Sequence, residues 1–489
     1  MTLHVGGCTA AVAPGCVEVL RTQLEGGPPE AWPGFAVVKE STVRTVRAGL
    51  IGAALHVHTK TYRPVRWTDR ARDLLQGTRA RVEFANLQRA RALGLPAVEP
   101  LAFGTTTATP SQSFLVTRSV PGAAPVPRRS LPPELAAELG TLLRRVHDAG
   151  VDASDLHPGN VLVDAAGGLH LVDLTNVRFG PGLESTVRAR ALAFFLLDLD
   201  GGPLHPDAAP LLAAYDASPG LRQRCALAWR RLSIAALRSF GQRALRACRD
   251  TTLAGEGPTR VFKHRPAGAL ADDAVAAEPH LADAQAHKLG RRGGVWLREG
   301  LVAKRRSPAH ARALFRAAYW LLRAGVPAPM PVALILHRDR ATVWSERLPG
   351  ADLRTQLGRG ELDRDTVRRA ARSLGSAVGR LHAHGLRNRD LKLENLLLHP
   401  RSGAVIMLDL DGVRRKAPND RRGCAGDLGR LLAAFRQAGA PGNLATLASF
   451  LQGYNRARTC LGLRRLDPFT RRLTGARAAA LASPSAGPS

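Results

Sequence analysis

The sequence repeats one polar spacing in which a carboxylic acid is followed five residues later by an amide. In DLHPGN the pair is Asp155 and Asn160, and in DLKLEN it is Asp390 and Asn395. A carboxylate can orient an incoming hydroxyl and accept its proton, and an amide oxygen can bind Mg²⁺. A short loop keeps both groups at one edge of a site. The motifs therefore predict phosphoryl transfer from ATP, with the two aspartates as bases and the two asparagines as metal ligands.

Two further groups complete this chemistry in each copy. In LHLVDLTNV and AVIMLDLDGV an apolar run ends at an acid, and we predict that Asp173 and Asp409 are the second ligands of Mg²⁺. Lys60 in HVHTKTY and Lys304 in GLVAKRR are predicted to bind the phosphates of ATP. Only 7 of the 70 basic residues are lysine, so lysines at these positions are informative. Lys392, two residues after the acid of the second motif, is expected to contact the transferring phosphate.

The helix after each lysine strand should carry a carboxylate that fixes the lysine. In the first copy this group is predicted to be Glu83, as the partner of Lys60. Alignment of the glycine turns that follow these helices places Leu314 opposite Glu83, and no acidic residue occurs between Glu299 and Asp339. The second copy is therefore predicted to lack this ion pair.

The two motifs belong to a longer internal repeat. A histidine, a glycine, the acid and the amide recur at the same spacing in LLRRVHDAGVDASDLHPGN and VGRLHAHGLRNRDLKLEN. The offset between the two copies is the one that separates Asp155 from Asp390. We interpret the histidines, His147 and His382, as structural hydrogen-bonding residues. Upstream, SFLVTRSVPGA matches ATVWSERLPGA, and RALGLPAVEPLAFG matches LRAGVPAPMPVALI. Four blocks in the same order indicate a duplicated domain of roughly 230 residues.

Periodicity predicts a β-rich front and a helical back in each copy. Strands are expected within 43–62 and 294–305, and helices over 79–93, 310–324, 132–149, 365–384, 188–197, 222–248, 427–438 and 444–456. Residues 266–287 contain no aromatic side chain and much alanine, which indicates a surface segment or a long insert. The predicted domains are 1–258 and 259–473, followed by a disordered tail over 474–489.

Charge and composition narrow the class of partner. The net charge is +30, of which residues 1–258 carry +7 (29 basic, 22 acidic) and the remainder +23 (41 basic, 18 acidic). Such a surplus favours an anionic partner, although a general drift towards arginine gives the same composition. Basic residues are not interleaved with aromatic ones, which argues against nucleic acid. The sequence contains no apolar run long enough to cross a membrane, no signal-peptide pattern and no CxxC pair of cysteines. These features predict a cytoplasmic protein with reduced thiols.

These residues resemble the protein-kinase-like superfamily. Within it, TDRARDLLQGTRARVEFANLQRARALGLPAVEPLAFG and HARALFRAAYWLLRAGVPAPMPVALI are similar to the bacterial lipopolysaccharide core kinases, the heptose and Kdo kinase group. The resemblance covers roughly 40–250 and 295–465. It implies an α+β fold of two tandem bilobal kinase-like domains. It also implies ATP and Mg²⁺ as cofactors and transfer of phosphate to a sugar hydroxyl of a lipid-linked glycan at the inner face of the membrane.

Several alternatives remain open at this point. RDLKLENLLL also resembles Ser/Thr protein kinases, and DLHPGNVLVD resembles aminoglycoside and choline phosphotransferases. Leu314 and weak glycine loops, placed at 43–54 and 287–296, favour a pseudokinase module that binds or regulates. The basic segments 288–306 and 401–422 are expected to contact acidic membrane surfaces. The acceptor hydroxyl and the oligomeric state have no signature in the sequence.

Overall fold

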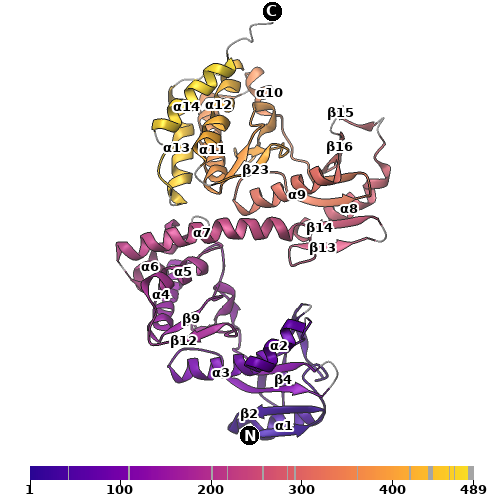
Figure 1. Cartoon of the computed structure of the whole chain (residues 1–489), viewed down its shortest axis with the longest axis vertical. Helices are drawn as coiled ribbons and strands as arrows, with labels where there is room; N and C mark the ends of the chain where they lie inside the picture. Colours follow the sequence, from indigo (N-terminus) through magenta and orange to yellow (C-terminus); the bar gives the residue numbers. More distant parts are fainter. Residues whose placement is uncertain are drawn as a thin grey trace, which may run out of the picture. The chain divides into compact units, whose positions relative to one another are not determined.

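The chain folds into two compact units, Met1–Trp229 and Arg230–Ser489, which are described separately. The computed structural model describes residues 1–482 except 42, 66, 108–110, 200–201, 217, 256–257, 283–284, 291–292, 361, 418–419, 439–443, 462 and 467. Each unit combines an antiparallel sheet with a group of helices (Figure 1).

The sheet of the first unit has the strand order β1-β2-β6-β7-β5-β4-β3 over the described residues. Its strands are β1 (Thr2–Val5), β2 (Cys8–Val12), β3 (Ala36–Glu40), β4 (Arg44–Ile51), β5 (Leu55–Tyr62), β6 (Pro100–Thr106) and β7 (Ser113–Arg118). Side chains alternate between the faces of a strand. In β5 this alternation buries Val57 and Thr59 and leaves Lys60 half-buried on the opposite face.

The sheet of the second unit has the same order position by position, β13-β14-β18-β19-β17-β16-β15. Its strands are β13 (Thr251–Ala254), β14 (Arg260–His264), β15 (Lys288–Gly290), β16 (Gly293–Arg298), β17 (Leu301–Arg306), β18 (Pro331–Leu336) and β19 (Ala341–Glu346). The predicted strand regions 43–62 and 294–305 are confirmed as β4–β5 and β16–β17.

Each sheet also contains an edge hairpin that the sequence did not predict. Hairpin β1–β2 pairs onto β6, and hairpin β13–β14 pairs onto β18. These strands are short and weakly apolar, so they leave little alternation to detect. The second compact unit starts at Arg230, and its sheet includes β13. It therefore begins before residue 259.

Helices flank each sheet. The first unit has α1 (Val17–Glu25), α2 (Trp67–Gln76) and α3 (Arg79–Ala92), and the second has α8 (Ala269–Ala277) and α9 (Pro308–Arg323). Residues 266–287, predicted to be a surface segment or a long insert, contain α8, which follows the edge hairpin as α1 does in the first unit, so the segment is not an insert. Ala271 and Ala274 of α8 are buried in one core cluster with Trp296 and Trp344. Small alanine side chains let the helix approach these large indoles closely.

The helical part of each unit follows its sheet. In the first unit it contains α4 (Pro133–Asp148), α5 (Ser185–Phe195), α6 (Ala208–Tyr215) and α7 (Pro219–Arg243), which extends past the unit boundary. In the second it contains α10 (Leu353–Gly358), α11 (Arg364–Ala383), α12 (Arg421–Gln437), α13 (Leu444–Cys460) and α14 (Pro468–Ala482). The helices expected over 79–93, 132–149, 310–324 and 365–384 are confirmed with small shifts at their ends.

Glycines allow corresponding helices to pack closely in both units. A Cβ on Gly140 of α4 would lie 2.2 Å from the Leu211 carbonyl oxygen of α6. A Cβ on Gly375 of α11 would lie 2.1 Å from the Phe450 carbonyl oxygen of α13. Both distances are far below van der Waals contact, so each pair of helices requires glycine at its crossing.

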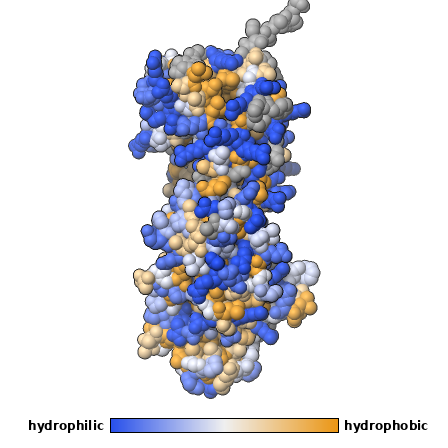
Figure 2. Space-filling model, turned by 90° about the vertical axis from the view of Figure 1, so that its left-hand side faces the viewer, coloured by the Kyte–Doolittle hydropathy of each residue, from blue (hydrophilic) through white to orange (hydrophobic). Residues whose placement is uncertain are grey.

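The predicted tail over 474–489 is helical in its first part, because α14 continues to Ala482, and its last residues, 483–489, lie outside the described part. No described helix is long and apolar enough to cross a lipid bilayer. Hydrophilic residues cover much of the face seen in Figure 2, with apolar residues scattered among them.

Candidate active site

In the first unit a buried carboxylate anchors the lysine of strand β5. Thr78 caps the start of α3 through the Arg81 N–H, and one turn further on Glu83 is fully buried. The Lys60 Nζ lies 2.6 Å from Glu83 Oε1, as the sequence predicted. Because the pair is almost excluded from water, this contact fixes the lysine and the helix relative to each other.

Two hydroxyls complete the surroundings of Glu83. The Tyr62 hydroxyl donates to Glu83 Oε2, and the Thr175 hydroxyl lies 3.1 Å from the same oxygen. Tyr62 ends the lysine strand, whereas Thr175 follows Asp173 by two residues. Glu83 therefore joins the strand, the helix and the loop of the predicted metal ligand.

Asp173 occupies a strained backbone conformation among cations. Its φ of 63° makes it the one described residue other than glycine in the left-handed region, a conformation that costs free energy and is found at functional sites. Asp173 Oδ2 lies 2.8 Å from Arg44 Nη1, and Asp173 Oδ1 lies 3.6 Å from Lys60 Nζ. Burial alone would raise the pKa of Asp173, but Lys60 and Arg44 outweigh it and lower the pKa to about 2. The group is therefore an anion at neutral pH.

The acid–amide motif of the first unit forms a short turn after strand β9 (Val151–Ala153). The side-chain amide of Asn160 donates to the Asp155 carbonyl oxygen at 3.3 Å. Asp155 Oδ2 accepts a hydrogen bond from the Asn176 amide at 2.7 Å. Asn176 was not predicted, and it holds the carboxylate that we interpret as the base.

The second unit brings its lysine and acid together without a helix carboxylate. Lys304 Nζ lies 3.0 Å from Asp409 Oδ1. Burial would raise the pKa of Asp409, but Lys304 outweighs this effect and the pKa is lowered. On α9, Leu314 is buried in the apolar core, so the predicted absence of a Glu83 equivalent is confirmed.

The acid–amide motif of the second unit is held more tightly. The Asn395 amide lies 2.9 Å from both the carbonyl oxygen and the Oδ2 of Asp390. The Asp390 N–H donates to Asn388 Oδ1 at 3.0 Å, and Lys392 Nζ lies 3.2 Å from Asp390 Oδ1. The side chains of Lys392 and Asp390 are 48% and 42% exposed, so this ion pair contributes little to stability and leaves Lys392 partly accessible.

Sequence reasoning missed an ion pair in the second unit. Arg306 Nη2 lies 3.0 Å from Asp411 Oδ2, and both side chains are largely buried. Arg306 follows Lys304 by two residues, as Tyr62 follows Lys60, and Asp411 follows Asp409 as Thr175 follows Asp173. The second unit thus adds a second ion pair between its lysine strand and the acid loop, at positions where the first unit places two hydroxyls around Glu83.

A second missed residue, Asp427, contacts the strand and the helix that lead into the acid–amide motif of the second unit. Its Oδ2 accepts from the Asn388 N–H at 3.1 Å and lies 3.2 Å from His382 Nε2, and its Oδ1 lies 2.5 Å from Arg430. Helices α5 and α12 begin at 185 and 421, the offset that also relates Asp173 to Asp409. At this offset the first unit has Ala191.

In both units a backbone hydrogen bond connects the two residues that are predicted to bind Mg²⁺. The Val172 N–H donates to the Asn160 carbonyl oxygen at 3.0 Å, and the Leu408 N–H donates to that of Asn395 at 2.9 Å. These bonds tie each amide residue to the position just before the predicted acidic ligand. One carboxylate and one amide oxygen are hard donors that suit Mg²⁺, and the described residues form no richer cluster of acids, histidines and cysteines.

The two predicted glycine loops fall on different elements. Residues 43–54 cover β4 and the turn that follows it, and not the connection between β3 and β4. Residues 287–296 do span the connection between β15 and β16, although residues 291 and 292 lie outside the described part.

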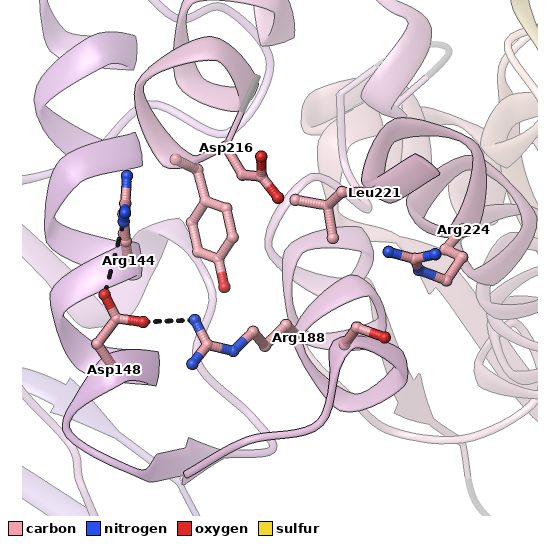
Figure 3. A pocket seen from close by; sticks show the side chains of 8 residues that line it. Arg144, Asp148, Arg188, Asp216, Leu221 and Arg224 are labelled. Carbon is pink, nitrogen blue, oxygen red and sulfur yellow. Dashed lines mark hydrogen bonds and ion pairs between the residues drawn. The ribbon is translucent and has the colours of Figure 1, made fainter. Parts of the chain in front are cut away.

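A cavity of about 170 Å³ lies among the helices of the first unit, and none of the predicted site residues lines it (Figure 3). Asp148 on its wall pairs with Arg144 and, at 2.5 Å, with Arg188. Nearby, His147 Nδ1 lies 2.8 Å from the Tyr215 hydroxyl, as His382 Nδ1 lies 2.9 Å from that of Tyr454. The structural role predicted for both histidines is confirmed.

Burial of His147 predicts acid sensitivity in the first unit. Burial, with a smaller effect of Arg188, lowers the pKa of His147 to about 4. Between pH 7 and 5, His147 becomes protonated in the unfolded state but stays neutral in the folded state. The free energy of unfolding of the first unit should therefore fall by about 2 kcal/mol. Hydrogen exchange of first-unit amides at both pH values measures this, and His147→Phe should remove most of the difference. An unchanged pH dependence in the variant would contradict the assignment.

The profile of the lipopolysaccharide kinase (Kdo/WaaP) family matches residues 35–178 and 284–454, one segment in each unit. These segments cover well over half of the chain. The protein belongs to the lipopolysaccharide kinase (Kdo/WaaP) family, and it is therefore a phosphotransferase of a family that acts on a sugar hydroxyl. A comparison with curated proteins found no match.

Proposed function

We propose that the chain transfers the γ-phosphate of ATP, with Mg²⁺, to a sugar hydroxyl of the lipopolysaccharide core or a related glycolipid. One observation carries the proposal: a lysine from a sheet strand meets the acid after the acid–amide motif in both units, at 3.6 Å for Lys60–Asp173 and 3.0 Å for Lys304–Asp409. A cation next to an ionised carboxylate matches the needs of a metal-bound triphosphate.

Each residue type has a role in this scheme. Lys60 and Lys304 bind phosphate oxygens, with Glu83 orienting the first of them. Asp155 and Asp390 orient the acceptor hydroxyl and take its proton, and Lys392 contacts the transferring phosphate. The residues that would hold Mg²⁺ are Asn160, Asp173, Asn395 and Asp409. The metal supplies charge neutralisation of the triphosphate.

In this proposal the units are two tandem bilobal kinase-like domains, with 1–258 and 259–473 as their approximate limits. The protein works in the cytoplasm, peripherally at the inner face of the membrane. The basic segments 288–306 and 401–422 support an approach to acidic lipid, because each added arginine or lysine near such a surface strengthens the attraction.

One of the two units is a candidate for a regulatory module that binds nucleotide without transferring phosphate. Leu314 leaves Lys304 without a helix carboxylate, whereas Ala191 leaves the first catalytic loop without a buried acid. The absence of either acid would suit a unit that binds nucleotide and regulates the other unit. Mg-ATP titrations of Lys60→Met and Lys304→Met in the full chain separate the units, because only a nucleotide-binding unit loses binding with its lysine.

The test of the main proposal is phosphate transfer to purified lipid-linked core glycan with Mg-ATP. Incorporation is expected in the wild type, and Asp155→Ala combined with Asp390→Ala should reduce its rate by at least about 100-fold. Label that enters protein and never glycan would favour a protein kinase. Incorporation unaffected by the double substitution would refute the assignment of both bases.

A further inference from the structure

Helix α2 is an element of the first unit that the second unit does not share. It lies in sequence between the strand of Lys60 and the helix of Glu83. In the second unit β17 ends at Arg306 and α9 begins at Pro308, which leaves no room for such a helix. The proposed chemistry assigns no role to α2.

The apolar face of α2 is open to solvent. Trp67, Leu74 and Leu75 stand at positions i, i+7 and i+8, which share one side of a helix. Their exposed fractions are 79%, 87% and 86%. An amphipathic helix of a globular protein normally turns this face to the core, so the orientation of α2 is reversed.

One ion pair links the polar face of α2 to the next helix, and two more lie within α2 itself. Asp69 Oδ1 lies 2.9 Å from Arg79 Nη2, at the start of α3, and 3.8 Å from Arg72. Arg72 also pairs with Asp73 at 3.0 Å. The pair between Asp69 and Arg79 ties the polar side of α2 to α3, and the tryptophan and the two leucines lie on the opposite side of the helix.

The surrounding sequence is basic. From Arg63 to Arg81 there are six arginines and two aspartates. Exposed tryptophan and leucine with a surplus of arginine are typical of helices that lie in the interface of an anionic membrane.

We propose that α2 inserts Trp67, Leu74 and Leu75 into the headgroup region of an anionic phospholipid bilayer and so holds the first unit at the membrane. This inference rests on the proposed function, in which the acceptor is anchored in a membrane by lipid. Because α2 follows the Lys60 strand after a short connection, it would keep the phosphate-binding residues close to that surface.

The test is sedimentation of the full chain with phosphatidylcholine vesicles that contain about 30% phosphatidylglycerol. Replacing Trp67, Leu74 and Leu75 together by serine should weaken binding at least about tenfold, because little apolar area remains to insert. Leu444→Ser is the matched control, since Leu444 is 86% exposed on α13, and it should bind as the wild type does. Brominated lipid should quench fluorescence of the wild type more than that of Trp67→Phe.

Two outcomes would overturn the inference. One is vesicle binding by the triple variant equal to that of the wild type. The other is a wild-type dimer that dissociates in the triple variant, since a second copy would then be the occupant of this face. Phosphorylation of a soluble, delipidated glycan by the triple variant should equal that of the wild type. Absence of phosphorylation by both proteins would refute the proposed function, whereas the vesicle result would still decide the role of α2.

Discussion

Replacing Glu83 by alanine is expected to lower the stability of the first unit by about 3–5 kcal/mol, because it removes the partner of a buried charge. Lys60 would lose its 2.6 Å contact, and the hydroxyls of Tyr62 and Thr175 would lose a common acceptor. Hydrogen exchange of first-unit amides under native conditions measures this change. Mg-ATP affinity should fall together with stability, since Lys60 would no longer be oriented.

Glu99→Ala provides the control for this variant. Glu99 pairs with Arg118 at 2.6 Å, but the two side chains are 37% and 49% exposed. Exposed pairs contribute less than about 1 kcal/mol. Equal losses in the two variants would show that burial of Glu83 does not decide its effect.

Replacing Asp427 by alanine is expected to have a comparable effect on the second unit, about 3–5 kcal/mol. The side chain is buried, and its loss would remove the acceptor of the Asn388 N–H and the carboxylate next to His382 Nε2. Because Asn388 in turn accepts from the Asp390 N–H, the base should be displaced as well. Turnover with the glycan acceptor should therefore fall more than Mg-ATP binding does.

Asp365→Ala is the matched surface variant in the second unit. Asp365 is 75% exposed and pairs with Arg368 at 3.5 Å, so its removal should cost less than about 1 kcal/mol. If Asp427→Ala changed stability and left the ratio of turnover to binding intact, its influence on Asp390 would be disproved.

Local patterns were sufficient to predict the elements that carry the chemistry. Lys60 and Lys304 stood out because the chain otherwise uses arginine, and the helix period after β5 pointed to Glu83. The roles of these residues in binding and catalysis remain predictions. The ion pair between Lys60 and Glu83 could be predicted because a strand and the helix after it are close in sequence.

Contacts between distant segments could not be predicted in the same way. Arg306 and Asp411 are more than one hundred residues apart, and neither position has a charged counterpart in the first copy. Helix α8 was misread because alanine-rich segments bury little area by themselves, and only the indoles of Trp296 and Trp344 make that helix part of a core.

The unequal placement of Glu83 and Asp427 has a consequence for inhibitor design. A compound that recognises a lysine clamped to its neighbouring helix would distinguish the first copy, in which Lys60 pairs with Glu83. In the second copy Lys304 pairs with Asp409, and Leu314 stands at the position of Glu83. A compound that depends on a rigid Asp390 loop would distinguish the second copy instead. Under the proposed function, these differences would let each copy be inhibited separately, so that its contribution to phosphate transfer could be measured in living cells.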